Sequence, residues 1–593
     1  MVNAQSIDRV QRNQVQRMQD DNGSISLIPI NRTPLGPPFV TELAAGFVQG
    51  DVIIGPEIAT SISGFYDYKT NGESNHYIQQ DPANPLAFHV IDMQADSVDA
   101  TGVTSRRIKY AFSLDGGVVW SFADNVPGIR AGYGVLALKS DGSAIIANHS
   151  QPGAILNANL YVDAFPGLGS FTEYLAQAPS AIWPQISVLS NGNVIMLSRP
   201  QSSTSGAQND TLYYCIWNGT SLGPKQVFWI ATPPYAGGVA FSNMAFNVAD
   251  NNNGTVGMIA NPEQEMDVFE SPIVHMKIST DNAATFGEAF DIFTPFLENG
   301  NQDTVYIAGG HDLTFKPGTN DWVWVASGTA DGLFAKTRLF LIKGTGNTVT
   351  STQVIADTVN LPMMARTYTQ TWAFQYPIDH PKLGWSEDGS ALYCSFDVVT
   401  SDTGARGWNT RDVFYMYSTN NGTNWSEPVR ITNTPTIDEG FPSISQWNLG
   451  TTALTHTLNM SYMKDPGDGP SSFNGTGLLM PPTRNTLIYR KMTMATTNIS
   501  NSITNLNDYK LLQNYPNPFN PSTTITYNLP RKEFVTLKVY NVLGKEVASL
   551  VNATQDAGIQ NITFDASRLA SGLYFYSISA GDFKDIKKMM LVK

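Results

Sequence analysis

The chain has 593 residues, with 36 Lys and Arg against 50 Asp and Glu, which gives a formal net charge of −14 at pH 7. A chain of this length exceeds one ordinary hydrophobic core, so we expect two or more domains or one large repeat architecture. Residues 508–593 hold ten Lys and Arg against seven Asp and Glu, so the preceding part carries about −17, which argues against nucleic acid as a partner.

The first 39 residues (1–39) predict an N-terminal arm that is extended or disordered. Residues 4–21 are rich in Gln and Arg without an apolar face, and four prolines between residues 29 and 38 favour an extended backbone. The start lacks a basic segment followed by an apolar one, and no stretch is long and apolar enough to cross a membrane. A trimmed leader and an unprocessed cytosolic start both stay open.

Residues 40–497 repeat one pattern: an apolar strand, a polar turn with Gly, a second apolar strand and a more amphipathic pair. Asp141-Gly142, Asn191-Gly192 and Asp388-Gly389 supply the positive φ angles that two-residue hairpins need. About seven such units recur at a spacing of about 50 to 70 residues, which predicts an all-β fold with a six- to seven-bladed β-propeller. The expected inner strands lie near residues 86–92, 133–138, 184–189, 242–248, 311–315, 381–385 and 441–446.

Cysteines and metal ligands give no signature of a site. Cys215 and Cys394 lie in separate strand-like segments, so two buried free thiols are favoured over one disulfide. The seven histidines are scattered and no H-E-x-x-H occurs, so we expect no cofactor. A structural Ca²⁺ in the Asp/Asn-rich loop 249–254 stays open, although the spacing does not fit an EF-hand.

Three segments share a short motif: SLDGGVVW at 113–120, STDNAATF at 279–286 and STNNGTNW at 418–425. They resemble the Asp-box, S-x-D-x-G-x-T-W, of BNR-repeat and sialidase-like propellers. The short carboxylate or amide can accept backbone N–H groups of its own turn, Gly allows the reversal, and the aromatic fills the gap between sheets. The resemblance implies turns between the outer strands of a blade, which indicate the fold and not an activity. The matching residues are Ser113, Asp115, Gly117, Trp120, Ser279, Asp281, Phe286, Ser418, Asn420, Gly422 and Trp425.

A sialidase-like glycoside hydrolase would need more than these boxes. The resemblance implies an arginine triad, a Tyr/Glu nucleophile pair, an Asp acid and an early F/Y-R-I-P motif. No R-I-P occurs, and Arg130 in PGIRAGYG, the nearest early candidate, lacks the proline. This departure puts sialidase activity in doubt, since an anionic sugar needs bidentate guanidinium partners.

The residues just before each expected inner strand would surround the opening of a propeller. Aromatic rings there could stack on a sugar face, and carboxylates could bond hydroxyls or act as an acid/base pair. The alternative is that these polar residues only cap turns at strand starts. The candidates on this axial face are Arg130, Tyr133, Trp183, Asn243, His311, Asp312, Asp379, His380, Asp438 and Glu439.

The end of the chain has a different pattern. Residues 498–508 are polar and predict a linker. QNYPNPFNPSTTITYNLP, VYNVLGKEV, FDASRLASGLYFY and a KKMMLVK ending then follow in order within 509–593, and the alternation predicts a small Ig-like antiparallel β-sandwich. This segment resembles the type A C-terminal sorting domain of the type IX (Por) secretion system of Bacteroidetes. The residues that carry the resemblance are Tyr515, Pro516, Asn517, Pro518, Phe519, Asn520, Pro521, Gly544, Gly572, Lys587 and Lys588.

The sorting-domain resemblance implies periplasmic transit, passage through the type IX translocon, processing by sortase-like machinery, and surface attachment or release. An adhesive Ig-like domain is the alternative. With the propeller in front of it, we expect an exported protein that binds an extracellular glycan or protein ligand. A glycoside hydrolase acting on a polysaccharide and a structural surface-layer or filament subunit that self-associates remain the alternatives.

Overall fold

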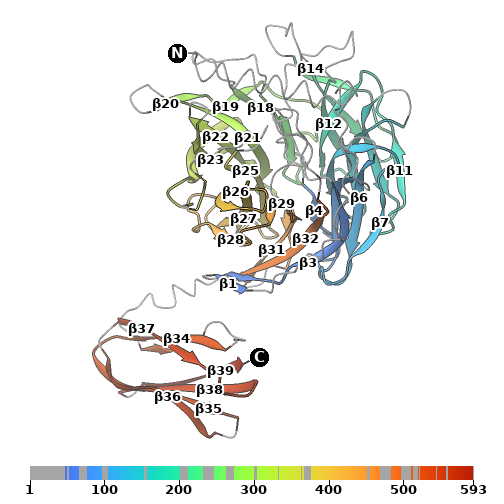
Figure 1. Ribbon diagram of the computed structural model, residues 1–593. Coiled ribbons are helices and arrows are strands. Elements are labelled where there is room, and N and C mark those ends of the chain that lie inside the picture. Colours follow the sequence, from blue (N-terminus) through green and yellow to red (C-terminus); the bar gives the residue numbers. More distant parts are fainter. Residues whose placement is uncertain are drawn as a thin grey trace. The chain divides into compact units, whose positions relative to one another are not determined.

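The protein is described by a computed structural model in which every regular element among the described residues is a β-strand (Figure 1). The chain divides into two compact units: a larger one that includes Pro56–Thr451 and His456–Met492, and a smaller one that includes Thr493–Lys593 with Gly46–Gly55 and Thr452–Thr455. The structure describes residues 47–49, 52–65, 76–95, 105–152, 156–200, 211–230, 246–261, 273–298, 303–330, 333–361, 363–365, 376–450, 455–467, 483–495, 509–511, 514, 519, 521–542, 544–555, 558–581 and 583–591. The expected N-terminal arm, the linker and Asn243 lie outside these residues.

The larger unit begins with three four-stranded antiparallel sheets that follow one another along the chain. The first contains β4 (Ile78–Gln80), β5 (Phe88–Ala95), β6 (Arg106–Ser113) and β7 (Ser121–Asn125). The second contains β8 (Ala131–Leu138), β9 (Ala144–Ser150), β10 (Asn157–Asp163) and β11 (Phe171–Tyr174). The third contains β12 (Ala181–Val188), β13 (Val194–Pro200), β14 (Thr211–Trp217) and β15 (Gln226–Ile230).

Three further sheets continue the series. One contains β16 (Phe246–Asp250), β17 (Val256–Ala260), β18 (Val274–Ser279) and β19 (Phe290–Phe293). The next contains β20 (Phe296–Glu298), β21 (Asp303–Phe315), β22 (Asp321–Ala330), β23 (Leu333–Thr345) and β24 (Thr348–Ala356). The third contains β25 (Ile378–Ser386), β26 (Leu392–Thr403), β27 (Asn409–Ser418), β28 (Val429–Arg430) and β30 (Trp447–Asn448).

The last sheet of the larger unit combines both ends of its sequence. It contains β29 (Asp438–Ile444), β31 (Thr455–Asp465) and β32 (Asn485–Ala495), and the early strand β3 (Ile58–Gly64) pairs antiparallel with β32. The inner strands contact one another in the order β4, β8, β12, β16, β21, β25, β29, and β29 contacts β4 again. This closed ring of sheets is propeller-like, as Figure 1 illustrates. An early strand that completes the last sheet fastens the ring.

The turn residues explain the hairpins of the ring. Gly142, Gly192 and Gly389 have φ angles of 85°, 82° and 66°, and each lies in the turn between the first two main strands of its sheet. These are the three hairpins that the Asp-Gly and Asn-Gly pairs predict. The prediction of the first inner strand, near residues 86–92, was wrong. Residues 88–92 belong to β5, the second strand of its sheet, and the innermost strand is the three-residue β4. A strand of three residues leaves too little alternation to detect in the sequence.

The smaller unit has two antiparallel sheets around one core. One contains β33 (Lys510–Leu511), β34 (Ser522–Leu529) and β37 (Gly558–Asp565), and the other contains β36 (Glu546–Gln555), β35 (Glu533–Asn541), β38 (Gly572–Ala580) and β39 (Phe583–Leu591). Ile525, Val539 and Tyr576, from both sheets, lie in the same buried cluster. The hairpin β1 (Phe47–Gln49) and β2 (Val52–Ile54) is antiparallel.

The sorting-motif residues that the structure describes lie in or next to these sheets. Phe519 is buried, its N–H donates to the carbonyl of Met590 at 2.9 Å, and its ring contacts Phe564. Gly544, with φ of 73°, lies in the turn between β35 and β36. Gly572 begins β38, Lys587 and Lys588 lie on β39, and Pro521 directly precedes β34. Tyr515, Pro516, Asn517, Pro518 and Asn520 lie outside the described residues.

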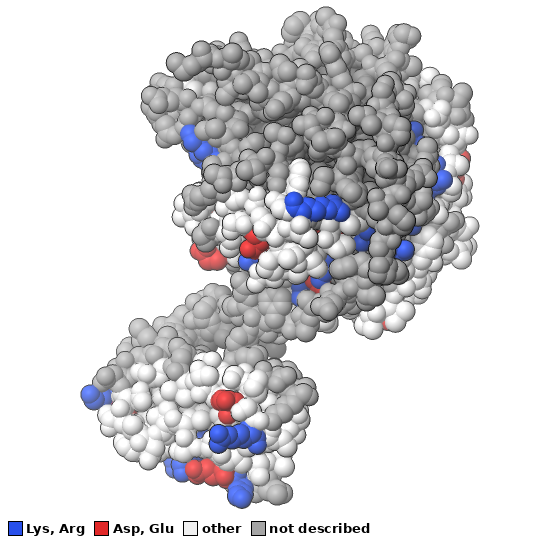
Figure 2. Space-filling view, viewed as in Figure 1, with Lys and Arg blue, Asp and Glu red and all other residues white. Residues whose placement is uncertain are grey.

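Cys215 and Cys394 are free and buried, which confirms the expectation of two thiols. No helix long and apolar enough to span a membrane occurs in the part of the chain that the structure describes. On the face seen in Figure 2, the described Lys, Arg, Asp and Glu are scattered among uncharged residues and form no continuous basic stripe.

Candidate functional site

Five inner strands have a register shift, β21 among them, and in the other four the shift lies close to where the strand begins. In β8, β12, β25 and β29 the pairing register with the next strand shifts, which is the mark of a β-bulge. The residue inside each bulge has a positive φ: 52° at Tyr133, 51° at Trp183, 51° at His380 and 54° at Phe441. A left-handed backbone at a bulky residue costs of order 1–3 kcal/mol and persists only where the surroundings impose it. We call these four the bulge residues.

The surroundings that impose this geometry are visible. The Tyr133 N–H donates to Sδ of Met93 at 3.2 Å, the Trp183 N–H to Nδ1 of His149 at 3.5 Å, and the Phe441 N–H to Oδ2 of Asp397 at 2.8 Å. Each acceptor lies on the second strand of the preceding sheet (β5, β9 and β26). At three of the four bulges a side chain of one sheet therefore holds the bulge of the next sheet, whereas the His380 N–H donates to Oδ1 of its neighbour Asp379 at 2.9 Å.

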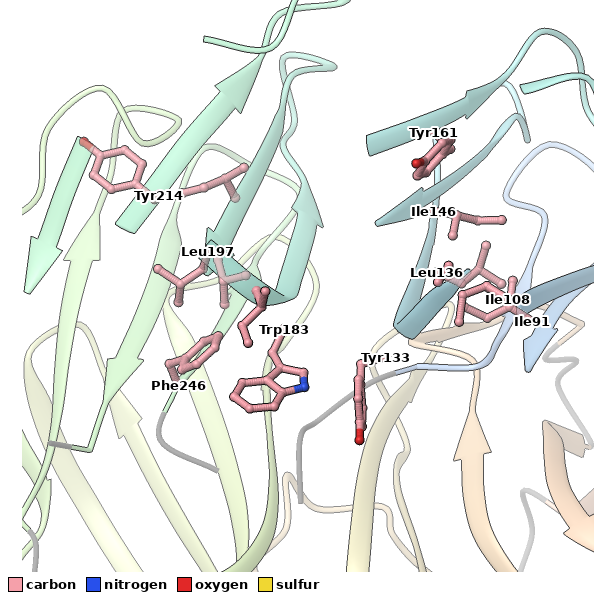
Figure 3. Close-up of a cluster of buried hydrophobic side chains, with 14 of the residues drawn as sticks. Ile91, Ile108, Tyr133, Leu136, Ile146, Tyr161, Trp183, Leu197, Tyr214 and Phe246 are labelled. Atoms are coloured by element: carbon pink, nitrogen blue, oxygen red, sulfur yellow. The ribbon is translucent and has the colours of Figure 1, made fainter. Parts of the chain in front are cut away.

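Tyr133 and Trp183, which face each other in Figure 3, form a cluster with His149 and two arginines. Their ring centroids are 5.9 Å apart in a T-shaped contact, and the ring of His149 lies 5.1 Å from Tyr133 and 6.2 Å from Trp183. The guanidinium of Arg199 lies 3.6 Å from the Trp183 ring centroid, and that of Arg106 lies 5.2 Å from the Tyr133 ring. Both cations stack on the negative faces of the rings. The indole Nε1 of Trp183 is buried and has no hydrogen-bond partner among the described residues.

His380 and Phe441 form a second cluster, on the neighbouring strands β25 and β29. Their ring centroids are 4.4 Å apart, and the guanidinium of Arg411 lies 4.7 Å above the Phe441 ring. The His380 Nδ1 lies 2.8 Å from Oδ2 of Asp397, and Arg411 forms a bidentate ion pair with Asp438, with Nη2 to Oδ2 at 2.8 Å and Nε to Oδ1 at 3.2 Å. The Nε2 atom of His380 is buried without a hydrogen-bond partner in the described ranges.

The carboxylates predicted on the axial face are engaged with neighbouring strands. Asp379 accepts the N–H groups of Gly310 at 2.7 Å and Tyr376 at 3.0 Å. Asp312 accepts the Leu383 N–H at 2.7 Å and lies 3.1 Å from Nε2 of His76.

The charge states of these carboxylates follow from their partners. Burial alone would raise the pKa of Asp312, but His76 and Lys382 outweigh it and hold the pKa below its ordinary value. Burial, together with the charges of Glu57 and Asp412, raises the pKa of Glu439 to about 8 although Nζ of Lys464 is only 3.3 Å away. Glu439 is therefore largely protonated at neutral pH.

Of the remaining predicted residues, only Asp438 is tied to a cluster by a contact described above, its ion pair with Arg411. His311 accepts the indole N–H of Trp324 at 3.3 Å, so it is bound within its own sheet. Arg130 is half-buried just before β8. Asp438 and Glu439 precede the bulge of β29, and Phe441 occupies the position equivalent to Tyr133, Trp183 and His380.

Sequence reasoning missed the residues on second and third strands that surround the bulges. They share one property, a charged or imidazole side chain that is buried within a strand, and they are Arg106, His149, Arg199, Asp397, Arg411 and Lys464. A different pattern could have indicated Phe441. Three of the four bulge residues directly precede a proline, in Trp183-Pro184, His380-Pro381 and Phe441-Pro442.

The three turns that resemble Asp-boxes share one hydrogen-bond pattern. In each, the Ser hydroxyl donates to the side-chain oxygen two residues later and accepts the N–H four residues later. That side-chain oxygen, from Asp115, Asp281 or Asn420, also accepts the N–H four residues after it. Each turn joins the outer strands of its sheet. Trp120 contacts Tyr489 and Phe286 contacts Tyr214, each in the neighbouring sheet.

The loop considered for Ca²⁺ uses its oxygens internally. Asp250 Oδ2 accepts the Asn252 N–H at 2.9 Å, and Asn251 Oδ1 accepts the N–H groups of Asn253 and Thr255 at 2.8 and 2.9 Å. No group of three or more His, Cys, Asp or Glu side chains placed to hold a metal ion occurs among the described residues.

Comparison with known proteins identifies the end of the chain. Residues 513–593 match the family described as the secretion system C-terminal sorting domain. No curated protein matches the chain.

Among solved structures, the chain is similar to a polysaccharide lyase of family PL25, an ulvan lyase, with 9% identity, a TM-score of 0.42 and coverage of 73% of this chain and 95% of that one. It is also similar to the polysaccharide lyase Uly1 (9%, TM-score 0.40, 69% and 88%) and to an α-L-arabinanase of Penicillium chrysogenum (11%, TM-score 0.33, 73% and 98%). At these identities and scores, we base no functional argument on the likeness.

Proposed function

Because the chain ends in a type IX sorting domain and is therefore exported to the cell surface or secreted, we propose that its larger unit is a non-catalytic propeller that binds an extracellular glycan. The site is the ring formed by the four bulge residues, Tyr133, Trp183, His380 and Phe441. One observation carries the proposal: four strained, bulky residues occupy equivalent positions on inner strands, and two of them hold a buried nitrogen without a partner. Strain and unsatisfied polar atoms of this kind cluster at ligand sites.

We assign seven blades to the propeller and relate it to the sialidase-like, Asp-box kind. The seven-sheet ring, closed by β3, supports the blade number. The shared hydrogen-bond pattern of the turns at Ser113, Ser279 and Ser418 supports the relation to Asp-boxes. Equivalent inner-strand positions then lie at the same end of the ring, which brings all four bulge residues to one axial site.

A glycan suits this chemistry better than other ligands. Sugars present C–H faces to aromatic rings and hydroxyls to a few fixed polar groups, and the site combines three aromatic side chains with ring nitrogens of Trp183 and His380. The extracellular destination supplies such ligands. A protein ligand is the competing outcome of the experiment below.

The axial carboxylates favour binding over glycoside hydrolysis. A hydrolase needs two available carboxyl groups, about 5–5.5 Å apart for retention or about 6.5–9.5 Å for inversion. Asp312 and Asp379 instead accept backbone N–H groups from neighbouring strands, and Asp438 is paired with Arg411. Groups engaged in this way hold the inner strands in place.

The test is a screen of the full-length protein on an array of extracellular polysaccharides and oligosaccharides, with analysis of the products of every hit. We expect binding without turnover, and its loss in Trp183→Ala. Phe165→Ala is the matched control, because that aromatic is 68% exposed on a turn between β10 and β11, away from the inner strands. Release of products from a retained glycan would contradict the non-catalytic assignment, and silence on every glycan would contradict glycan binding.

A further inference from the structure

The two unpartnered nitrogens of the site differ in their hydrogen-bonding character. An indole Nε1–H can only donate a hydrogen bond. An imidazole nitrogen accepts or donates according to which ring nitrogen holds the proton, and that choice is set by the bond that the other nitrogen makes. The environments of Trp183 and His380 therefore fix which ligand groups the site can receive.

Asp397 determines the tautomer of His380. Its Oδ2 lies 2.8 Å from His380 Nδ1, and the same oxygen accepts the Phe441 N–H at 2.8 Å. The guanidinium Nη1 of Arg411 lies 4.0 Å from the same oxygen, and these partners keep Asp397 a carboxylate. A carboxylate only accepts, so the proton of the neutral imidazole resides on Nδ1. The lone pair of the neutral ring is then on Nε2, the atom without a partner.

The two nitrogens belong to opposite parts of the ring of inner strands. Trp183 is the bulge residue of β12 and His380 that of β25, and β16 and β21 lie between these strands on one side while β8, β4 and β29 lie between them on the other. Both side chains are nearly fully buried, at 3% and 2% exposure. In Figure 3 the indole nitrogen of Trp183 points toward the space between Trp183 and Tyr133.

We propose that Trp183 Nε1 and His380 Nε2 determine specificity as a fixed donor and a fixed acceptor, and that the ligand is a sugar unit with a free hydroxyl facing His380 and an oxygen acceptor facing Trp183. This inference rests on the proposed glycan-binding function and extends it. A sulfate, a phosphate or an ionised carboxylate cannot donate to Nε2, so an unsubstituted hydroxyl is required at that position. A site that hydrogen-bonds a hydroxyl rejects analogues without one, because its buried acceptor stays unpaired.

The experiment uses the full-length protein on an array that carries neutral oligosaccharides beside their sulfated and uronic-acid counterparts. Wild type is expected to retain neutral oligosaccharides. Trp183→Phe keeps an aromatic ring and removes the N–H donor together with the fused five-membered ring, and binding is expected to weaken at least about tenfold. His380→Gln supplies an amide oxygen as an acceptor and is expected to retain part of the binding.

His380→Lys separates a specificity role from a structural one. It offers only donors at this position, so we expect loss of the neutral glycans and a gain for sulfated or uronic-acid glycans. A merely structural role would lower binding to every glycan without changing the preference. Thermal unfolding of each variant checks that the fold is intact.

The outcomes distinguish the two proposals. Wild-type preference for the anionic glycans, or Trp183→Phe and His380→Lys variants that bind like wild type, would overturn the donor and acceptor assignment while glycan binding stands. If wild type retains no glycan in any series, both proposals fall.

Discussion

The Nζ of Lys464 lies 2.7 Å from Oε2 of Glu57, and both side chains are nearly fully buried. Glu57 directly precedes β3, the early strand that completes the last sheet, whereas Lys464 lies on β31, about 400 residues later. Glu57 also accepts the Tyr462 hydroxyl at 2.7 Å and lies 3.7 Å from Arg490. The point at which the ring of sheets closes is thus fastened by a buried ionic cluster as well as by strand pairing.

Glu57→Gln is expected to destabilise the larger unit by about 3–5 kcal/mol, since it leaves the Lys464 ammonium buried beside a neutral amide. Chemical unfolding at pH 7 measures the effect. Asp141→Asn is the control, because the Lys139–Asp141 pair is exposed and contributes about 1 kcal/mol or less. Equal stability of Glu57→Gln and wild type would show that the cluster does not fasten the ring.

Asp250 predicts a pH dependence of stability. Burial raises its pKa to about 7 despite the opposing hydrogen bonds from Asn252 and Ser187. Between about pH 4 and pH 7 the unfolded chain has lost this proton while the folded chain keeps it, so the free energy of unfolding falls as the pH rises through this window. Asp250→Asn imitates the protonated form and is expected to be more stable than wild type at pH 8, by up to about 4 kcal/mol.

The measurement is urea unfolding of wild type and Asp250→Asn at pH 5 and pH 8. The advantage of the variant should be small at pH 5 and should grow toward pH 8. Asp388→Asn is a control of opposite sign, because Ser390 and Ser386 hydrogen bonds outweigh burial and lower the pKa of that carboxyl. An advantage that is the same at both pH values would refute the titration of Asp250.

Gly117 tests the contact between the first and last sheets of the ring. A Cβ at this position would lie 2.2 Å from Cε1 of Tyr489. The φ of Gly117 is +85°, and that of its neighbour Gly116 is +83°. Gly117→Ala should therefore destabilise by more than the cost of a left-handed alanine, which is about 1–2 kcal/mol.

Gly192→Ala is the matched control for Gly117, since its φ is 82° and nothing lies within 4 Å of the added Cβ. The difference between the two variants in thermal unfolding isolates the clash with Tyr489. Equal losses would mean that the two sheets are not in close contact at this turn.

Deletion of residues 509–593 should leave the protein in the periplasm, because the type IX machinery reads the sorting domain. Cell fractionation and surface labelling measure the outcome, with Phe165→Ala of the full chain as the control for normal export. Surface display of the truncated chain would show that export does not depend on this segment.

Much of the backbone architecture was predictable, because it depends on local chemistry. Asp141-Gly142 and Asn191-Gly192 impose positive φ, and the apolar run in residues 133–138 marks an inner strand. Tyr133, Trp183 and His380 were also found as candidates, since they lie close to where inner strands begin. The sequence pattern treats these starts as regular strands, however, and a bulge shifts which residue reaches the axial position. For this reason Asp438 and Glu439 were chosen in place of Phe441.

The partners of the site could not be located from local patterns. Arg106, Arg199 and Asp397 contact bulge residues only because strands from different parts of the chain pair or pack together. The same long-range contacts explain why Asp312 and Asp379 looked available in sequence and yet accept backbone N–H groups of neighbouring sheets. The local sequence indicates the residue type and its approximate position. Whether a side chain is free for a ligand or hydrogen-bonded to a neighbouring sheet depends on the packing between sheets.

The central claim is that the bulge residues hold a glycan. Isothermal titration of the tightest glycan from the array into wild type, Trp183→Ala and Phe165→Ala tests it most directly. The account predicts a loss of affinity of at least about tenfold, about 1.4 kcal/mol, for Trp183→Ala and an unchanged affinity for Phe165→Ala. Equal affinities of all three proteins would contradict it.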